Sequence, residues 1–303
     1  MSEKFYSNGK LLLTGEYAIL DGAKGLAVPT KFGQSLELTT NKEAILSWTS
    51  IDNLGETWFS AQFNLKDLSL YSYSDATIAT TLQQILMVAK KLNSKFLKEG
   101  LGISAETRLT FPINWGLGSS STLINNIAQW AQVDAHQLLW NSFGGSGYDI
   151  SCAQYKTPII YCIENKQPKV NPISFNPKFK NQIYFVHLNQ KQSSKKAIIN
   201  YRSKQFVTQK LILEIDKITE AIVISKSLKE FEILLEKHEA ILANILEVTP
   251  IKEKLFSNYF GNIKSLGGWG GDFIIATGNK KTPEYFKSKG FDTVIPFTEM
   301  ILN

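Results

Sequence analysis

The sequence predicts an α+β protein of two domains. Its 303 residues, 43% of them hydrophobic, are enough for two ordinary domains with a substantial core. Strand-like alternation fills the first hundred residues, whereas long helical patterns follow residue 181 and strands return near the C-terminus. Because this texture changes between residues 170 and 185, we expect domains at 1–178 and 179–303.

The predicted first domain begins with strands and continues with helices. Alternating segments separated by Gly, Asn and Asp indicate strands at Lys10–Thr14, Ser35–Thr40, Ala44–Ser50, Thr57–Asn64, Gly102–Phe111 and Pro158–Ile163. Apolar spacing of three and four residues indicates helices at Thr77–Leu97, Ser121–Gln132 and Asp134–Trp140.

The predicted second domain closes with a sheet of its own. A strand at Ile183–Leu188 precedes long helical patterns, and Leu228–Leu246 carries its apolar residues on one face. Further strands are expected at Asp272–Thr277 and Thr293–Phe297.

The composition excludes several classes of protein. Lys and Arg (33) exceed Asp and Glu (27) by six, which favours anionic ligands without forming a long basic tract, so we expect no nucleic-acid partner. Cys152 and Cys162 suggest neither a disulfide framework nor a zinc site. With no signal peptide or long apolar segment, we expect a cytoplasmic protein without membrane contact, as a monomer or a homodimer.

A glycine- and serine-rich stretch, FPINWGLGSSSTLI at 111–124, lies between a predicted strand and a predicted helix. The first turn of a helix leaves amides unpaired at the positive end of its dipole, and Gly116 and Gly118 allow an anion to come close. The hydroxyls of Ser119, Ser120 and Ser121 could bind phosphate or magnesium. The pattern lacks the Gly-Lys-Ser/Thr ending of a P-loop. A turn whose serine only caps the helix is the alternative.

Two other stretches share this richness in glycine. SLGGWGGDFIIA at 265–276 places four glycines within five residues, more than an ordinary turn needs, although a packed β-bend is an alternative. GKLLLTGEYAILDG at 9–22 interrupts a strand pattern with Lys10 and with Gly15-Glu16, and by itself it is equally consistent with a surface hairpin.

Taken together and in this order, the three stretches resemble the motifs of the GHMP kinases, the superfamily of galactokinase, homoserine kinase, mevalonate kinase and phosphomevalonate kinase. Pro-x-x-x-Gly-Leu-Gly-Ser-Ser, here PINWGLGSS at 112–120, is the most specific of them. GEYA at 15–18 and GSGYDIS at 145–151 resemble the mevalonate-pathway members. The resemblance covers nearly the whole chain.

The resemblance implies an N-terminal domain like ribosomal protein S5 domain 2, a ferredoxin-like C-terminal domain, and ATP-dependent phosphorylation of a small alcohol with Mg²⁺. It favours mevalonate or phosphomevalonate, in isoprenoid precursor biosynthesis, as the acceptor. The residues implied to bind ATP are Gly116, Leu117, Gly118, Ser119, Ser120 and Ser121, with Ser120 also a magnesium ligand. Those implied near the acceptor are Glu16, Gly147, Ser194, Gly268, Gly270 and Gly271.

Two residues match the catalytic positions of the family. Asp149, in a Gly-Ser-Gly-Tyr-Asp turn, would accept or orient the proton of the acceptor hydroxyl. Lys10 would lie near Asp149, lower its pKa and neutralise developing charge. The alternatives are an Asx-turn residue before a strand for Asp149 and an exposed edge-strand lysine for Lys10.

Several other side chains have open assignments. The run KQSSKK at 191–196 either begins an acceptor-binding helix or forms a solvated basic turn. Trp115 and Trp269 lie in glycine loops, where packing is a simpler role than stacking on adenine. The histidines, which have no metal partner at suitable spacing, are expected to be structural: they are His136, His187 and His238.

One departure from the family pattern concerns magnesium. Mevalonate kinases usually carry a metal-binding glutamate about eleven residues before the catalytic aspartate, and here Leu138 occupies that position beside Gln137. Asp134 is the only acidic residue between the phosphate loop and Asp149. We therefore keep two alternatives: a fold member that lost catalysis and binds or regulates, and a kinase for another small alcohol.

Overall fold

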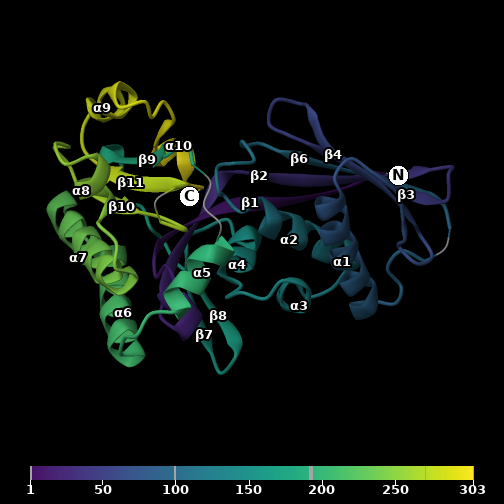
Figure 1. The fold of residues 1–303 in the computed structure, drawn as a ribbon, viewed down its shortest axis with the longest axis horizontal. Coiled ribbons are helices and arrows are strands. Elements are labelled where there is room, and N and C mark those ends of the chain that lie inside the picture. Colours follow the sequence, from purple (N-terminus) through teal and green to yellow (C-terminus); the bar gives the residue numbers. More distant parts are fainter. Residues whose placement is uncertain (1, 99, 191–193, 270, 303) are drawn as a thin grey trace. The chain divides into compact units, whose positions relative to one another are not determined.

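The structure is a computed structural model that describes residues 2–98, 100–190, 194–269 and 271–302. The chain forms two compact units, each built from several segments (Figure 1). The first comprises residues 1–9, 32–113 and 117–154, and the second comprises 10–31, 114–116 and 155–303. The domain boundary after residue 178 stays a prediction.

The first unit contains a sheet covered by helices. Strand β6 (Gly102–Leu109) pairs antiparallel with the later part of β2 (Gly25–Asn41) and parallel with β3 (Ile45–Ile51). The sheet continues through β4 (Thr57–Asn64) to β5 (Leu70–Tyr73), both antiparallel. The opening residues of β1 (Glu3–Thr14) also belong to this unit.

Four helices complete the first unit: α1 (Ala76–Leu92), α2 (Ser119–Ala131), α3 (Ala135–Ser142) and α4 (Tyr148–Gln154). Their apolar faces and the strands form one core, which includes Trp48, Phe59, Phe63, Ile124 and Leu138. Helix α1 ends at Leu92, before the predicted Leu97, because Asn93 leaves helical geometry and its side chain binds Lys95 N–H and Ala131 O.

The second unit contains an antiparallel sheet in the order β10-β11-β9-β12. These strands are β9 (Ile183–His187), β10 (Ile263–Ser265), β11 (Phe273–Thr277) and β12 (Val294–Pro296). The early residues of β2 pair with β7 (Ile159–Glu164), which pairs with β8 (Gln167–Pro172). Short 3-10 turns lie at Ala18–Asp21 and Lys180–Gln182.

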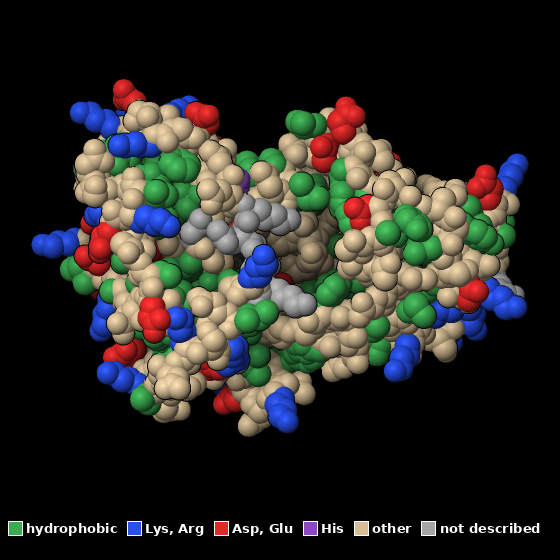
Figure 2. Space-filling model, in the orientation of Figure 1, with side chains coloured by type: hydrophobic (Ala, Val, Ile, Leu, Met, Phe, Trp, Pro, Cys, Tyr) green, Lys and Arg blue, Asp and Glu red, His purple; other side chains and the backbone are tan. Residues whose placement is uncertain are grey.

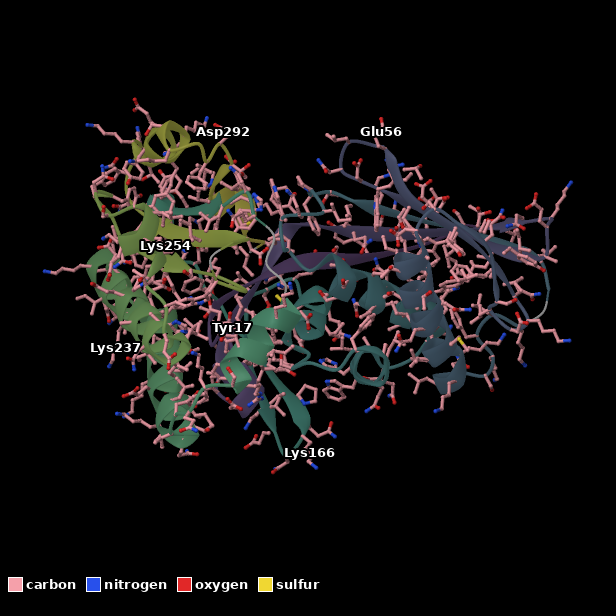
Figure 3. The ribbon with its side chains drawn as sticks, in the orientation of Figure 1. Tyr17, Glu56, Lys166, Lys237, Lys254 and Asp292 are labelled. Carbon is pink, nitrogen blue, oxygen red and sulfur yellow. The ribbon has the colours of Figure 1, made fainter. Side chains whose placement is uncertain are left out.

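The long helix α7 packs against β10 of this sheet, and α6 packs on α7 (Figure 1). The helices of the second unit are α5 (Ser194–Arg202), α6 (Thr208–Ile224), α7 (Leu228–Leu246), α8 (Ile251–Leu255), α9 (Thr282–Ser288) and α10 (Phe297–Met300). Tyr17, labelled in Figure 3, stacks on Tyr201 of α5 with ring centroids 5.3 Å apart. These rings join a core that reaches Leu211 of α6 and Leu242 of α7.

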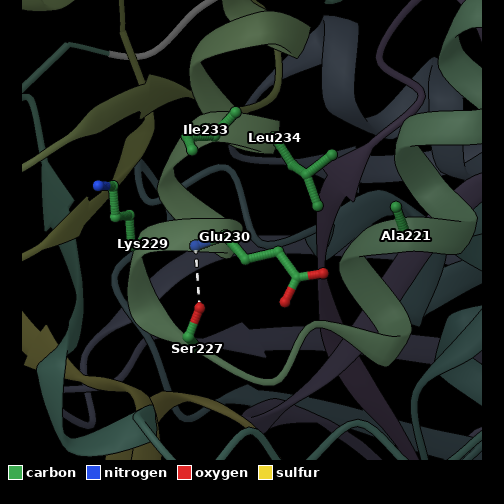
Figure 4. A pocket seen from close by; sticks show the side chains of 6 residues that line it. All are labelled: Ala221, Ser227, Lys229, Glu230, Ile233 and Leu234. Carbon is green, nitrogen blue, oxygen red and sulfur yellow. Dashed lines mark hydrogen bonds between the residues drawn. The ribbon is translucent and has the colours of Figure 1, made fainter.

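A shallow pocket between α6 and α7 contains none of the glycine-rich residues. It is lined by Ala221, Ser227, Lys229, Glu230, Ile233 and Leu234 (Figure 4). Ser227 caps α7 by accepting the Glu230 N–H (3.2 Å), while the Glu230 carboxylate accepts the Lys226 N–H (3.0 Å). The polar groups of this pocket therefore serve the start of the helix.

The α+β class is confirmed, and the bounds of β4 and α7 are those predicted. Strands β5, β8 and β10 and helices α4, α8, α9 and α10 are short elements that the patterns did not reveal. Both cysteines are free. Among the described residues, no helix has the length and apolar character needed to span a bilayer.

Candidate active site

The start of α2 presents the predicted phosphate loop in the first unit. Gly118 precedes the helix with φ +90°, a conformation that disfavours side chains. The amide of Thr122 donates to Gly118 O (3.0 Å), so the amides of Ser119, Ser120 and Ser121 come before the first intrahelical donor. Unpaired amides at the positive end of a helix dipole are groups that favour a nearby anion, and the predicted role of these residues in binding ATP stays a prediction.

The three serines at this helix start have different environments. Ser120 is exposed and Ser119 half-buried, whereas Ser121 is buried and its hydroxyl donates to Gly118 O (2.8 Å). Ser120 therefore presents the most accessible hydroxyl for a phosphate oxygen or a magnesium ion, while the Ser121 hydroxyl stabilises the turn.

A buried network of neutral groups holds α2 in place. The Thr122 hydroxyl donates to Gln34 Oε1 (2.7 Å), and Asn126 Nδ2 donates to Gln34 O (2.9 Å). Ser7 Oγ donates to Asn126 Oδ1 (2.7 Å) and accepts from Asn125 Nδ2 (2.8 Å). All five side chains are at most 3% exposed, so these bonds orient the helix inside the first unit.

Asp149 lies in the first turn of α4, a helix that the sequence patterns did not predict, so the alternative of an Asx turn before a strand is wrong. Gly147, with φ +81°, accepts the Ser151 N–H (3.1 Å) and so begins the helix. The Asp149 side chain is half-buried. A short helix after a glycine turn thus presents this carboxylate.

Helix α3 supports the turn before Asp149. His136 Nε2 and Ser151 Oγ lie 3.0 Å apart, and Trp140 Nε1 donates to Gly145 O (3.2 Å). Burial lowers the pKa of His136, which favours its neutral form. The expectation that His136 is structural agrees with these contacts.

In the second unit, Lys10 and His187 hold the other end of the phosphate loop. Lys10 Nζ donates to Gly116 O (3.3 Å), and His187 Nε2 donates to Asn114 O (3.2 Å). The tautomer of His187 is fixed because its Nδ1 accepts the Asn189 N–H (3.3 Å). Trp115 packs edge-on against Phe273 with centroids 5.5 Å apart, as expected of a packing residue.

The third glycine stretch reaches the same loop through Asp272. A Cβ added to Gly116 (φ +67°) would lie 2.6 Å from Asp272 Oδ1, and one added to Gly267 would lie 3.3 Å from Oδ2. Gly268 is half-buried and Gly271 is buried, while Gly270 lies outside the described residues. Only glycine at 116 leaves room for this carboxylate beside the loop.

Glu16 is 2% exposed, with its carboxylate facing Lys264 of β10 and His238 of α7. Lys264 Nζ donates to Glu16 Oε1, and His238 Nε2 lies 3.3 Å from Glu16 Oε2. Burial raises the pKa of Glu16, and the Lys264 ammonium opposes that shift. Its predicted contact with the acceptor stays a prediction.

The basic run at 191–196 is only partly described. Residues 191–193 lie outside the described residues, α5 begins at Ser194, and Lys196 is exposed. The side chain of Ser194 is likewise outside them, so its predicted role stays a prediction. On the face in Figure 2, the described Lys and Arg side chains are scattered among acidic ones.

Two residues bear on the metal-binding glutamate that the family pattern leads one to expect: Leu138, which stands in its place, and Asp134, the nearest acidic residue before Asp149. Leu138 is fully buried in the core of the first unit, and Asp134 caps α3 by accepting the Gln137 N–H (2.7 Å). Across the described ranges there is no group of three or more His, Cys, Asp or Glu able to hold a metal. The predicted role of Ser120 as a magnesium ligand stays a prediction.

No protein-family model matches the sequence, and no curated protein matches it. Solved structures do. A mevalonate kinase has a TM-score of 0.73 at 17% identity, covering 99% of this chain and 100% of that one. The Methanococcus jannaschii mevalonate kinase has a TM-score of 0.72 at 17% identity, covering 97% and 96%. The Streptococcus pneumoniae phosphomevalonate kinase, in complex with phosphomevalonate and AMPPNP, has a TM-score of 0.67 at 14% identity, covering 95% of each chain.

These likenesses span essentially the full length of both chains. The chain has the fold of the GHMP kinases. At these identities the comparison establishes the fold, and the activity has to be argued from the residues themselves.

Sequence reasoning did not find all the residues that shape this region. Lys264, Glu239 and the loop contact of His187 were missed, and Asp272 was considered only as the end of a glycine stretch. Their partners are 26 to 248 positions away along the chain, from Glu239 with Ser265 to Lys264 with Glu16. No local pattern carries such a signal.

Proposed function

We propose that this protein is an ATP-dependent kinase for a small alcohol. The observation that carries the proposal is the pair of supports around one loop: Lys10 Nζ bound to Gly116 O, and the α2 start at Ser119 with its first-turn amides. Such a helix start stabilises anions, and the lysine adds a positive charge at Gly116, in the segment of the chain that leads into the helix. The GHMP kinase fold is consistent with a triphosphate at this loop.

The residues have distinct proposed roles. The amides and hydroxyls of Ser119 and Ser120 hold phosphate oxygens, and Ser120 contributes a ligand to Mg²⁺. Magnesium, when bound, neutralises phosphate charge. Asp149 accepts the proton of the acceptor hydroxyl. The hydroxyl oxygen forms a bond to the γ-phosphorus of ATP, the bond between the γ-phosphorus and the bridging oxygen breaks, and ADP leaves. Lys10 stabilises the developing charge. The predicted proximity of Asp149, in the first unit, and Lys10, in the second, stays a prediction.

Mevalonate and phosphomevalonate are the acceptors we favour, which would give the protein a role in isoprenoid precursor biosynthesis. The support is the mevalonate-pathway character of GEYA at 15–18 and GSGYDIS at 145–151, together with the likeness to mevalonate and phosphomevalonate kinases. A galactokinase from Lactococcus lactis, complexed with galactose, has a TM-score of 0.68, so sugars belong among the tested acceptors.

A second candidate function is a binding protein that has lost catalysis. The observation that favours it is Leu138, an apolar and fully buried residue where mevalonate kinases usually carry a metal ligand. Such a protein would bind nucleotide without transferring phosphate.

The test is ADP release from Mg-ATP with mevalonate, phosphomevalonate, homoserine or galactose. We expect turnover with one acceptor, and a fall of kcat by about 10²–10⁴-fold in Asp149→Asn, the range that a positioned acid–base group contributes. Asp292→Asn is the matched control because Asp292 is exposed in the second unit (Figure 3).

One result would contradict the kinase, and another would contradict the role of Asp149. Nucleotide binding by calorimetry without turnover of any acceptor would support the binding protein instead. Turnover that persists undiminished in Asp149→Asn would leave a kinase but remove Asp149 from its chemistry.

A further inference from the structure

Two consecutive residues of α7 accept hydrogen bonds from the backbone of two different glycine stretches. His238 Nε2 accepts the Gly15 N–H (2.9 Å), at the end of β1. Glu239 accepts both the amide (2.9 Å) and the hydroxyl (2.8 Å) of Ser265, directly before the third glycine stretch. One helix turn thus contacts segments that are 250 residues apart in the chain.

An ion pair joins the same two segments. Glu16, which follows Gly15, binds Lys264, which precedes Ser265, and Lys264 Nζ also donates to Ser265 O (2.8 Å). Glu16, His238, Glu239 and Lys264 are each at most 4% exposed. We call these four residues the α7 network. It ties the ends of β1 and β10 to each other and to α7.

The α7 network places four ionisable side chains in a buried region. Burying ionisable groups costs free energy that apolar side chains of similar volume avoid. The hydrogen bonding of the network is also incomplete, since Glu16 Oε2 and His238 Nδ1 have no hydrogen-bond partner among the described residues. Packing alone therefore does not account for these four side chains.

The segments it holds need an external constraint. Gly15 has φ +89° and Gly267 has φ +63°, and glycine-rich backbone has more conformational freedom than any other. Tyr17 at φ +62° and Asp272 at φ +51° hold strained conformations for residues with side chains. Hydrogen bonds at Gly15 and Ser265 fix the points from which both stretches leave their strands.

We propose that the α7 network is a set of positioning residues that fixes the backbone of the first and third glycine stretches and, through it, substrate binding. This inference rests on the proposed kinase function for its effect on activity, although its effect on the backbone does not. None of the four side chains is required to touch substrate.

Glu239 gives the sharpest test. Glu239→Ala leaves the Ser265 amide and hydroxyl without their acceptor. Glu239→Gln retains one oxygen to accept the amide and replaces the other with an NH2 group, which can donate to the Ser265 hydroxyl oxygen. Lys237→Ala is the control, because Lys237 is the exposed neighbour on α7 (Figure 3). Hydrogen exchange of peptides covering 263–275 and steady-state kinetics are measured for all three and for wild type.

We expect faster exchange at 263–275 in Glu239→Ala under conditions where exchange in β4 stays unchanged. KM for ATP or for the acceptor should rise about tenfold with a smaller change in kcat, because two buried groups of Ser265 lose their hydrogen-bond acceptor. Glu239→Gln should recover most of the KM, and Lys237→Ala should match wild type. If Glu239→Ala does not fold, Ser265→Ala takes its place, because it removes one of the two hydrogen bonds. It should give faster hydrogen exchange at 263–275 and a higher KM, each to a smaller extent.

The outcomes separate this inference from the proposed function. A wild-type KM in a folded Glu239→Ala protein, or equal loss in Glu239→Ala and Glu239→Gln, would overturn the positioning role while the kinase stands. If wild type neither binds nor turns over ATP, the proposed function fails, and hydrogen exchange alone tests the inference. Unchanged exchange at 263–275 in Glu239→Ala would then overturn it, and faster local exchange would support it.

Discussion

The two units hold their parts of the candidate site with networks of opposite character. In the first unit, Thr122, Gln34, Asn126 and Ser7 orient α2 through bonds between neutral groups. In the second, the α7 network orients two glycine stretches through Glu16, Lys264, His238 and Glu239. Both networks are buried, so the difference lies in charge and not in exposure.

The comparison teaches how each part of the site should respond to change. Removing one partner of a buried neutral hydrogen bond leaves the other group desolvated and unpaired. Removing one partner of a buried ion pair leaves an uncompensated charge, which destabilises the fold more. The neutral network also contains no group that titrates near neutral pH. The α7 network should therefore be more sensitive to substitution and to acid than the neutral network.

The largest effect on stability is expected from Lys264→Met. Removing the ammonium leaves the Glu16 carboxylate buried without its counter-ion, which should lower the free energy of unfolding by about 3–5 kcal/mol. Denaturant unfolding of this variant and of Glu16→Gln/Lys264→Met measures it, and the double variant should recover much of the loss. A double variant no better than the single one would show that the pair has no coupling.

A smaller loss is expected from Thr122→Val in the neutral network. Valine has nearly the same shape but leaves Gln34 Oε1 without its donor, so unfolding free energy should fall by about 1–3 kcal/mol. Urea unfolding at pH 7 and pH 5 should give the same difference from wild type. A difference that depends on pH would contradict the contrast between the networks.

The shared loop can be tested by comparing two glycines with positive φ. Gly116→Ala and Gly55→Ala each place a side chain in a left-handed conformation, at a cost of about 1–2 kcal/mol. Only at Gly116 does the new Cβ also meet Asp272, because Gly55 has open space around it. Nucleotide affinity, measured by calorimetry, should fall in Gly116→Ala and remain at the wild-type value in Gly55→Ala.

Acid should affect the second unit through His238. Burial and the Lys264 charge hold the pKa of His238 well below 6.5, so the unfolded chain binds the extra proton first as the pH falls. The contribution of His238 is therefore complete above pH 6.5 and is lost on acidification below it, at no more than about 1.4 kcal/mol per pH unit. Glu16 and Glu239, whose pKa values burial raises, act with the opposite sign as the pH rises above 4.5.

The His238 contribution is isolated by comparing wild type with His238→Gln, whose amide oxygen can still accept the Gly15 N–H. The difference in unfolding free energy between the two proteins should shrink between pH 7 and pH 5. A constant difference over this range would mean that His238 does not titrate in the way its burial requires.

Much of the fold could be predicted from local patterns. The bounds of α7 and β4 match because apolar spacing is a local property of a helix or a strand. Short elements were missed for the same reason: α4 has seven residues, too few for a periodic signal, so the helix that carries Asp149 was not predicted. The loop at 111–124 was predicted as a helix start because glycine and serine act on the backbone next to them.

The sequence by itself determined the α+β class, the three glycine stretches and a helix directly after the second of them, since these depend on residues that are neighbours in the chain. That helix was predicted at Ser121–Gln132, and the structure begins it two residues earlier, at Ser119. Only the tertiary structure decided that Gly15 bonds to His238, that Glu16 pairs with Lys264 and that Asp272 lies against Gly116. These contacts join residues more than a hundred positions apart. Their energies depend on burial and on the direction of each side chain, which folding sets and residue spacing does not encode.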